Sequence, residues 1–526
     1  MKLGRILLWG GLAPGLAAVL IAVLHHYQLK AAEERCRAEL KASGEPMSLA
    51  ETLPPPVSPE QNSADQFLKA CVLMERAETL LSSNPIAGRI MVAPGKAMAV
   101  AARPDIREPG KFGYTNSWAE AEAAVDRSGD CLTLLRGVIA KPKLDFHLAY
   151  EKGFADETFF TNEHLVEFKK CGQLLAAASL VDLHRRNVGV ALANTRAALA
   201  LADAMRDQRL IIAELVRIAI VGIAARSTWE LLQAPPVTEG DLTALQSSWE
   251  RLDFVHSYAD SLAMERILDE AMLARFRHSN DELGKYLGLS RKALLQLGLA
   301  DQGDPGIFER AGLTARMFLW RHWWSYTDET RNLRGRQILR EAAQGAQTNA
   351  PFAPLLTRQE SGLAALQLTS SADHLAGPLG VFGEPNLHFM LSDSVVTMSG
   401  CLRRVLTVET TKRLTVTAIA LKRFDLRHGS FPEQLNQLTP EFLPAVPLDP
   451  VDAQPLRYRR NGDGTFVLYS IGPDNKDDGG EPSLGKGAAS SSYNWLGWQA
   501  LDWVWPQPAT EAEIGQYFAE RANKSN

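Results

Sequence analysis

RLIIAELVRIAIVGIAARSTWELLQ, residues 209–233, decides the fold because it is the most apolar stretch after the N-terminus and has the length of one long helix. It stops at Pro235–Pro236, and a capping-box pattern at Thr238 and Asp241 begins the next helix. From Trp118 onward, the chain consists of similar helical segments with short breaks between them. Helices joined by short connections pack as antiparallel hairpins. The sequence therefore predicts a mainly α fold with a multi-helix body of antiparallel hairpins.

Length, composition and charge narrow the class of protein. The chain has 526 residues, and domains of about 100–200 residues are usual, so several are expected. Apolar residues make up 46% and charged residues 22%, which is typical of a globular protein. The net charge is only −5, without a basic stripe or a run of like charges. Because nucleic-acid binding needs clustered Lys and Arg for phosphate contacts, we expect no nucleic acid among the partners.

The N-terminus, MKLGRILLWGGLAPGLAAVLIAVLHHYQLK, predicts a transmembrane anchor. Lys2 and Arg5 precede an uncharged run from Ile6 to Leu24, which spans about 28 Å as a helix, close to the ~30 Å hydrocarbon core. Positive charges before a span favour a cytoplasmic N-terminus. We therefore expect a single-pass protein of the bacterial inner membrane, with the bulk of the chain in the periplasm. A cleaved signal peptide and a buried soluble helix are the alternatives.

Changes in composition along the chain predict six segments. They are the cytoplasmic N-terminus and transmembrane anchor (1–27), a stalk and Pro-rich linker (28–63), a helical body (64–370), a linker with the start of a long helix (371–404), an α+β module (405–506) and a C-terminal tail (507–526).

The α+β module is predicted from a hairpin signal near the C-terminus. PLRYRR (455–460) and TFVLYSI (465–471) have strand character, and the turn sequence Asn-Gly-Asp-Gly joins them. A two-stranded hairpin is marginal by itself. A helix that ends near Arg427, with Gly429 placed to terminate it, is expected to cover one face.

Three segments of this module carry a resemblance. HGSFPEQL, LPAVPLDPVDAQPLRY and YSIGPDNKDDGG, in that order, resemble the C-terminal domain of the major pseudopilin of type II secretion, over about residues 405–506. The resemblance implies one bound calcium ion in the last loop. It implies as ligands the Ile471 carbonyl and the carboxylates of the four residues Asp474, Asp477, Asp478 and Asp502.

The chemistry of the loop is compatible with that ion. Calcium takes six to eight oxygen ligands in flexible geometry, and closely spaced carboxylates repel one another without a counter-cation. A solvated acidic turn without metal is the alternative.

The chain departs from the pseudopilins in its layout. No leader-processing site lies near Ile6, and residues 28–404 separate the anchor from the module, so we do not expect assembly into a pseudopilus. The layout resembles large membrane-anchored bacterial envelope proteins. We therefore expect a membrane-anchored envelope scaffold or a secretion-related interaction protein, with other envelope proteins as partners and with no known substrate.

The usual catalytic motifs are missing, and no catalytic residue is predicted. The chain contains no H-E-x-x-H, no G-x-S-x-G and no P-loop. Glu214 and Arg217, three residues apart in the apolar segment, can pair on one helix face, and Glu265 and Arg266 are candidates for the same network. A structural ion pair is the simplest interpretation. A hydrolase-like enzyme with a polar site around Glu214 is the alternative.

The sequence allows more than one role for three tryptophans and for the five cysteines. Trp320, Trp323 and Trp324 have helical spacing, which is typical of helix packing; membrane-interface contact, or stacking on a bound carbohydrate or peptide, are the alternatives. The five cysteines are far apart and form no C-x-x-C motif. They are expected to be small buried hydrophobic residues, or to form disulfides if the body is exported.

Overall fold

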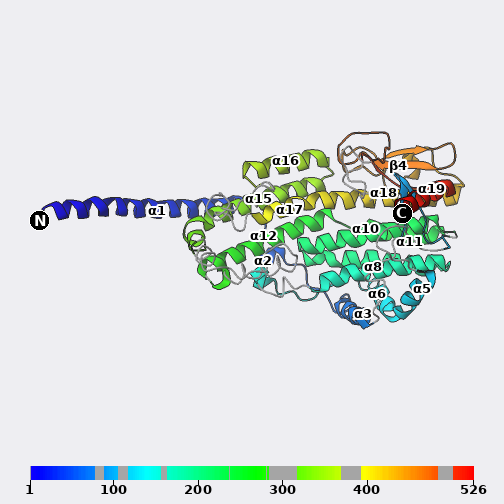
Figure 1. Ribbon diagram of the computed structural model, residues 1–526, viewed down its shortest axis with the longest axis horizontal. Helices are drawn as coiled ribbons and strands as arrows, with labels where there is room; N and C mark the ends of the chain where they lie inside the picture. The colour runs from blue at the N-terminus through cyan, green and yellow to red at the C-terminus, as the bar shows by residue number, and fades with distance from the viewer. Residues whose placement is uncertain are drawn as a thin grey trace.

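The computed structural model describes residues 2–76, 88–104, 117–155, 163–235, 237–279, 281–283, 315, 317–368, 393–483 and 501–525. These residues are mainly helical, with a few short strands, which confirms that the fold is mainly α (Figure 1). Most of the predicted linker at 371–404 lies outside the described residues, which resume at residue 393.

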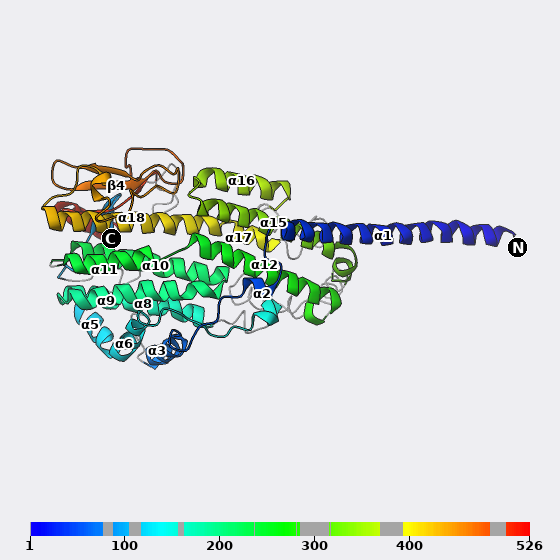
Figure 2. The same cartoon turned by 180° about the vertical axis from the view of Figure 1, so that it is seen from behind.

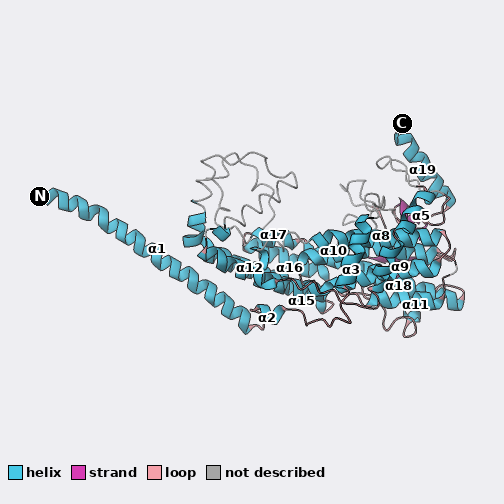
Figure 3. Cartoon of the chain, turned by 90° about the horizontal axis from the view of Figure 1, so that it is seen from below, coloured by secondary structure: helices cyan, strands magenta, loops and turns pink. Residues whose placement is uncertain are grey.

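The molecule is elongated, with the N-terminus and the C-terminal module at opposite ends. Helix α1 (Lys2–Ala42) protrudes from one end of the body, and strand β4 (Phe466–Ser470) lies near the other end (Figures 1 and 2). Helix α18 (Cys401–His428) runs along the long axis between them. Seen from below, α1 leaves the body at an angle to its helices (Figure 3). We call the end with α1 the near end and the opposite end the far end.

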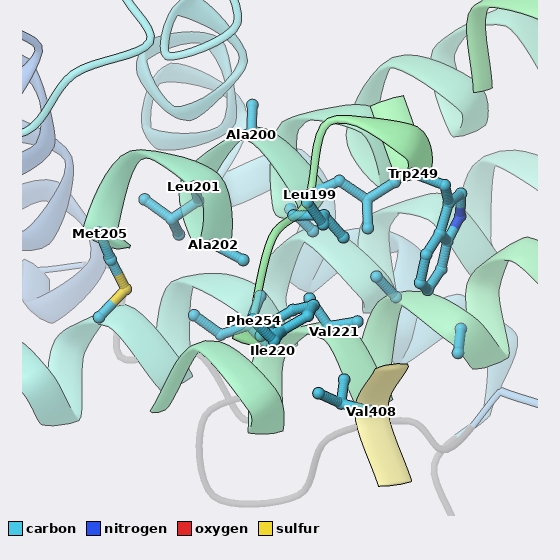
Figure 4. Close-up of a cluster of buried hydrophobic side chains, with 14 of the residues drawn as sticks. Leu199, Ala200, Leu201, Ala202, Met205, Ile220, Val221, Trp249, Phe254 and Val408 are labelled. Carbon is cyan, nitrogen blue, oxygen red and sulfur yellow. The ribbon is translucent and has the colours of Figure 1, made fainter. Parts of the chain in front are cut away.

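The far half of the body is built around α10 (Ile211–Gln233), the apolar segment that decides the fold. Helix α10 packs against three long helices, so it is apolar on several faces rather than along one stripe. Buried side chains from these helices interlock in the core, with Trp249 and Val408 among them (Figure 4). The three helices that pack on α10 are α8 (Glu163–His184), α9 (Val188–Ala204) and α18, and α11 (Glu239–Glu250) packs in turn against α9 and α18.

Local signals set several of these helix boundaries, as the sequence predicts. The capping box at the start of α11 is formed: the Asp241 amide donates to the Thr238 hydroxyl at 3.1 Å, and the Thr238 amide donates to the Asp241 carboxylate at 3.1 Å. Gly429 follows α18 with φ of 75°, the left-handed conformation that favours glycine after a helix.

The near half of the body is formed mainly by α12 (Val255–His278) and α15 (Ser325–Gln347), which pack along each other. A π-helical turn, η3 (Trp320–Trp324), leads into α15. Trp320 packs in a small buried cluster with residues of α12, including Phe276. The other helices here are α16 (Phe352–Ala365) and α17 (Asp393–Ser399).

Two three-stranded sheets lie in the far half. The predicted hairpin is present as β3 (Arg457–Arg460) and β4, antiparallel, with β5 (Trp503–Val504) on the other side of β4. Helix α18 packs against β4, as expected for the helix that ends near Arg427. The second sheet has the order β1-β2-β6, with β1 (Ile90–Ala93), β2 (Lys96–Met98) and β6 (Gln507–Pro508).

The second sheet joins two segments that are about four hundred residues apart in the sequence. Strand β6 pairs in parallel with β2, so a segment of the predicted tail lies beside a segment that was predicted to belong to the helical body. The Pro94-Gly95 turn between β1 and β2 is the local signal for this hairpin. The other helices among the described residues are α2 (Leu49–Thr52), α3 (Ala64–Arg76), α5 (Trp118–Arg127), α6 (Gly129–Gly137), η1 (Tyr150–Ala155), η2 (Met205–Gln208), η6 (Leu435–Leu438) and α19 (Glu511–Ser525).

The predicted stalk is helical and packs against the body. Residues 28–42 belong to α1, which contacts α15, and Cys36 and Leu40 are buried together with Leu333. The cysteines are all buried and unpaired, which agrees with their interpretation as small hydrophobic residues.

One stretch among the described residues, Val188–Gln208, is long and apolar enough to cross a membrane by length and composition alone. Since 72% of its apolar window is buried inside the body, packing against other helices accounts for its hydropathy. The predicted span at residues 6–24 belongs to α1 and stays a prediction.

Candidate functional site

The predicted calcium ligands lie in the loop after β4 and just before β5, and the structure separates them by burial. Asp502 is buried, with 1% of its surface exposed. Its Oδ2 accepts hydrogen bonds from the amides of Gly480 at 2.8 Å and Glu481 at 3.0 Å. Asp474 and Asp478 are exposed. The structure therefore does not bring all four carboxylates to one buried point.

Asp477 and Ile471 have protein partners. Asp477 Oδ1 accepts from the Tyr469 hydroxyl at 2.9 Å and from the Gly479 amide at 3.0 Å. Asp474 Oδ1 accepts from the Lys476 amide at 3.1 Å, which is a local turn. The amide of Ile471 donates to Asp449 at 3.0 Å. These contacts fix the loop through hydrogen bonds within the module.

Arg457 on β3 neutralises part of this acidic region. Its guanidinium contacts Asp449 at 3.3 Å, Asp452 at 2.6 Å and Asp477 at 3.4 Å. Asp449 is fully buried and also accepts from the Ser470 hydroxyl at 2.8 Å. Neither Arg457 nor Asp449 was predicted from the sequence to belong to this site. The alternation of side chains along RYRR, which places Arg457 and Arg459 on one face, was the available signal.

The described residues fit a cation only in part. They contain no group of three or more His, Cys, Asp or Glu side chains arranged to hold a metal ion. One atom nevertheless has the character of a ligand: Asp502 Oδ1 is buried and has no hydrogen-bond partner among the described residues. Burial, with a smaller effect from the negative charge of Asp477, raises the pKa of Asp502 to about 6, although hydrogen bonds from the amides of Gly480 and Glu481 oppose the shift.

The second predicted polar site, Glu214 with Arg217, is confirmed as an ion pair on α10. Arg217 Nη1 donates to both carboxylate oxygens of Glu214, at 2.8 and 2.7 Å, and to the Ser257 hydroxyl at 2.6 Å. Arg217 Nε donates to the Ala202 carbonyl at 2.7 Å. Burial raises the pKa of Glu214, and the guanidinium opposes that shift. The pair is buried and well bonded, as in a structural link between helices.

Glu265 and Arg266 bond to residues outside the Glu214–Arg217 pair. Glu265 accepts from the Ile211 amide at 2.7 Å and lies 3.5 Å from Arg336 Nη1. The two cavities lined by Phe431 with Trp505, and by Pro55 with Tyr150, include neither Glu214 nor Glu265. The carboxylate pair that a hydrolase would need is therefore not brought together around these cavities.

A larger charged cluster, which the sequence analysis did not find, joins α1 to the near half of the body. We call it the stalk network. Arg37 on α1 donates to Glu33 on the same helix, to Glu270 on α12 and to Glu329 on α15. The stalk network contains four carboxylates and four guanidinium groups: Glu33, Glu45, Glu270 and Glu329 with Arg37, Arg266, Arg277 and Arg340.

Burial makes the stalk network an electrostatically demanding site. Glu329 is 0% and Glu270 6% exposed, and burial raises the pKa of Glu270 to about 7 despite Arg37 and Arg266. Arg266 Nη2 also donates to the Pro46 carbonyl at 2.7 Å, which fixes the turn after α1. Matched charges in a buried interface specify one register between helices. The network can therefore hold α1 in a single position on the body.

The three tryptophans have different environments. Trp320 is buried, and its indole nitrogen donates to Asp328 at 2.8 Å, whereas Trp323 is 41% exposed. Trp324 is half-buried against the small cluster around Phe276. Helix packing therefore explains Trp320, while Trp323 is available to the surroundings of the protein.

Comparison of the chain with protein-family models, with curated proteins and with solved structures finds no match.

Proposed function

We propose that this protein is a membrane-anchored scaffold or interaction protein of the bacterial envelope, with a single N-terminal span and its body in the periplasm. On this proposal the far-end module, which resembles a pseudopilin domain, is held away from the membrane for contact with other envelope proteins. Helix α18 supports the geometry, because it runs from the near half to the sheet at the far end.

The observation that carries the proposal is the way α1 is divided. Its C-terminal part is fixed to the body by contacts of Cys36, Arg37 and Leu40, while its N-terminal part stands clear of the body (Figure 1). A 41-residue helix that leaves a folded body and carries an uncharged run at 6–24 has the layout of a rigid membrane tether. A cleaved signal peptide would not need a continuous helical connection to the body.

The test of this proposal is the topology of the full chain. Two reporters are fused in turn to the C-terminus. Alkaline phosphatase is active only after export, and green fluorescent protein fluoresces in the cytoplasm but not after export in an unfolded state. We expect an active phosphatase fusion that remains in the membrane pellet after alkaline extraction.

The paired substitution Lys2→Glu with Arg5→Glu is the matched control for orientation. It leaves the apolar run unchanged and removes the positive charges that favour a cytoplasmic N-terminus, so phosphatase activity should fall. Release of the wild-type chain into the soluble fraction, or a fluorescent cytoplasmic fusion, would contradict the proposal.

A calcium ion at the far-end module is a second candidate, and Asp502 Oδ1 favours it. A buried carboxylate oxygen without a partner among the described residues would gain a ligand bond, and calcium would favour the charged form of a group whose pKa burial has raised. Arg457 and the exposed positions of Asp474 and Asp478 reduce the need for that ion.

Thermal unfolding of the full chain in detergent tests the calcium candidate. Saturating calcium should raise the unfolding midpoint relative to chelator, since an ion at 100 times its Kd stabilises by about 2.7 kcal/mol. The shift should vanish in Asp502→Asn and persist in Asp463→Asn, which changes an exposed aspartate of the hairpin turn. An equal midpoint with chelator and with millimolar calcium would remove the ion from the proposal.

A further inference from the structure

Exposed aromatic side chains gather at the near end of the molecule. Among the described residues, the large hydrophobic side chains that are clearly exposed include three aromatic ones: Tyr27 (64%), Phe318 (57%) and Trp323 (41%). Leu319, next to Phe318, is exposed as well. The exposed aliphatic residues of the far half, such as Val190 and Leu426, lie on separate helices. We call Tyr27, Phe318, Leu319 and Trp323 the aromatic surface.

Contacts with α1 place the residues around η3 beside Tyr27. The ring nitrogen Nδ1 of His26 lies 3.2 Å from the carbonyl oxygen of His322, and the rings of His26 and Tyr326 meet edge to face with centroids 5.3 Å apart. The rings of Phe318 and His322 also touch, with centroids 4.5 Å apart. The aromatic surface is therefore formed by two segments that are about three hundred residues apart in the sequence.

The height of this surface along α1 matches the edge of the predicted span. The span ends at Leu24, and at 1.5 Å rise per residue His26 lies about 3 Å beyond it. The headgroup region adds roughly 5–8 Å on each side of the hydrocarbon core. His322, bonded to His26, therefore lies at the level of the lipid headgroups if residues 6–24 cross the bilayer.

Two tryptophans of the π-helical turn differ in exposure. Within η3, Trp320 points into the body and donates to Asp328, and Trp323 remains exposed three residues later. An exposed Trp beside a membrane span is costly in water, but its amphipathic ring is stabilised at the bilayer–water boundary. The turn thus presents to the surroundings a residue type that the interface favours.

We infer that the aromatic surface is a second membrane contact, in which Tyr27, Phe318, Leu319 and Trp323 insert among the lipid headgroups next to the anchor. The inference rests on the proposed membrane anchor and adds a fixed orientation: the near end of the body lies against the bilayer. Helix α1 and the aromatic surface then act together, because the stalk network prevents the body from turning about the anchor.

Quenching of tryptophan fluorescence in vesicles tests this inference. The full chain is reconstituted in phosphatidylcholine–phosphatidylglycerol vesicles, with and without phosphatidylcholine brominated near the headgroup end of its acyl chains. Trp9 lies in the predicted span, so the background variant Trp9→Phe leaves Trp323 as the expected lipid contact. We expect this background to lose about half or more of its remaining bromolipid quenching when Trp323→Phe is added. Adding Trp320→Phe, which changes a buried ring, should leave that quenching unchanged.

The outcomes separate the aromatic surface from the anchor. If Trp9→Phe reduces quenching relative to wild type but Trp323→Phe causes no further loss, the anchor stands and the aromatic surface does not contact lipid. If neither substitution changes quenching, both the anchor and the surface fail. A blue shift of Trp323 emission that depends on protein concentration in detergent would show that a second copy covers the surface, and would overturn the lipid contact. Unfolding midpoints equal to wild type confirm that the variants are folded.

Discussion

Two arginines, one near each end of the molecule, each hold three carboxylates, and they do so in different ways. Arg37 at the near end contacts Glu33, Glu270 and Glu329 from three helices. Arg457 at the far end contacts Asp449, Asp452 and Asp477 within one small module. Two partners of Arg37 are 233 and 292 positions away, whereas those of Arg457 are at most 20 positions away.

The difference indicates what each arginine does for the fold. Arg37 connects helices that are far apart in the sequence, so together with the apolar contact of α1 on α15 it fixes the position of α1 on α12 and α15. Arg457 joins consecutive turns of one chain segment and fixes the shape of a loop. Loss of Arg37 should therefore disturb the assembly of the near half, and loss of Arg457 should disturb only the module.

The largest effect is expected for Arg37→Ala. The substitution leaves Glu270 and Glu329 buried with one arginine fewer, and removal of one partner from a buried ion pair typically costs about 3–5 kcal/mol. We expect a value near the lower limit, about 3 kcal/mol, because Arg37 is 34% exposed and Arg277 and Arg266 still contact the two acids. Denaturant unfolding of the full chain in detergent measures it.

The matched control is Arg35→Ala, which removes an exposed arginine two residues away on the same helix. It should change the unfolding free energy by less than about 0.5 kcal/mol. Equal effects of the two substitutions would show that the buried contacts of Arg37 do not hold α1 on the body.

A smaller effect is expected for Arg457→Ala. Asp449 keeps its bonds from Ser470, Val451 and Ile471, and Asp477 is largely exposed, so the loss should be about 1–2 kcal/mol. Arg459→Ala, which changes the exposed arginine two residues along the strand, is the control. If calcium binds the module, its stabilising effect should increase in Arg457→Ala, because the ion then replaces the missing positive charge. An unchanged calcium response would indicate that arginine and ion do not compensate for each other.

Sequence spacing predicts contacts between residues that are close in the sequence. It does not predict the contacts of Arg37 with distant helices. The Glu214–Arg217 pair, the capping box at Thr238 and the β3–β4 hairpin depend on residues a few positions apart, and each is present as predicted. Helical spacing also allows Glu33 to meet Arg37. Nothing in the spacing indicates that Glu329 completes this set, because that contact exists only after α1 packs on α15.

The candidate site shows the same limit. The acidic loop was located correctly, but Asp474 and Asp478 are exposed, and the counter-charge comes from Arg457 on a neighbouring strand. The exposed position of Trp323 likewise depends on the π-helical turn, and a helix of regular period does not predict that turn. Burial and tertiary pairing, rather than residue type, decide these features.

The last prediction concerns the dependence of the unfolding free energy on pH. The pH range of this dependence differs between the two ends of the molecule. Burial raises the pKa of Glu270 from its ordinary value of 4.5 to about 7, so between these values the folded state binds more protons than the unfolded state. The unfolding free energy must then fall as pH rises through that range, by at most about 1.4 kcal/mol per pH unit for one group. For Asp502 the same reasoning gives a lower range, from 3.8 to about 6.

Glu270→Gln and Asp502→Asn remove these two protonation steps separately. Unfolding of the full chain from pH 4 to pH 8 should show a reduced slope between about pH 4.5 and 7 in Glu270→Gln, where Glu230 and Glu265, with pKa values also raised to about 7, keep part of the slope. Asp502→Asn should reduce the slope only below about pH 6. If Asp502→Asn also reduced the slope between about pH 6 and 7, the two carboxylates would share one electrostatic environment, and the separation between a buried near-end network and a local far-end loop would be wrong.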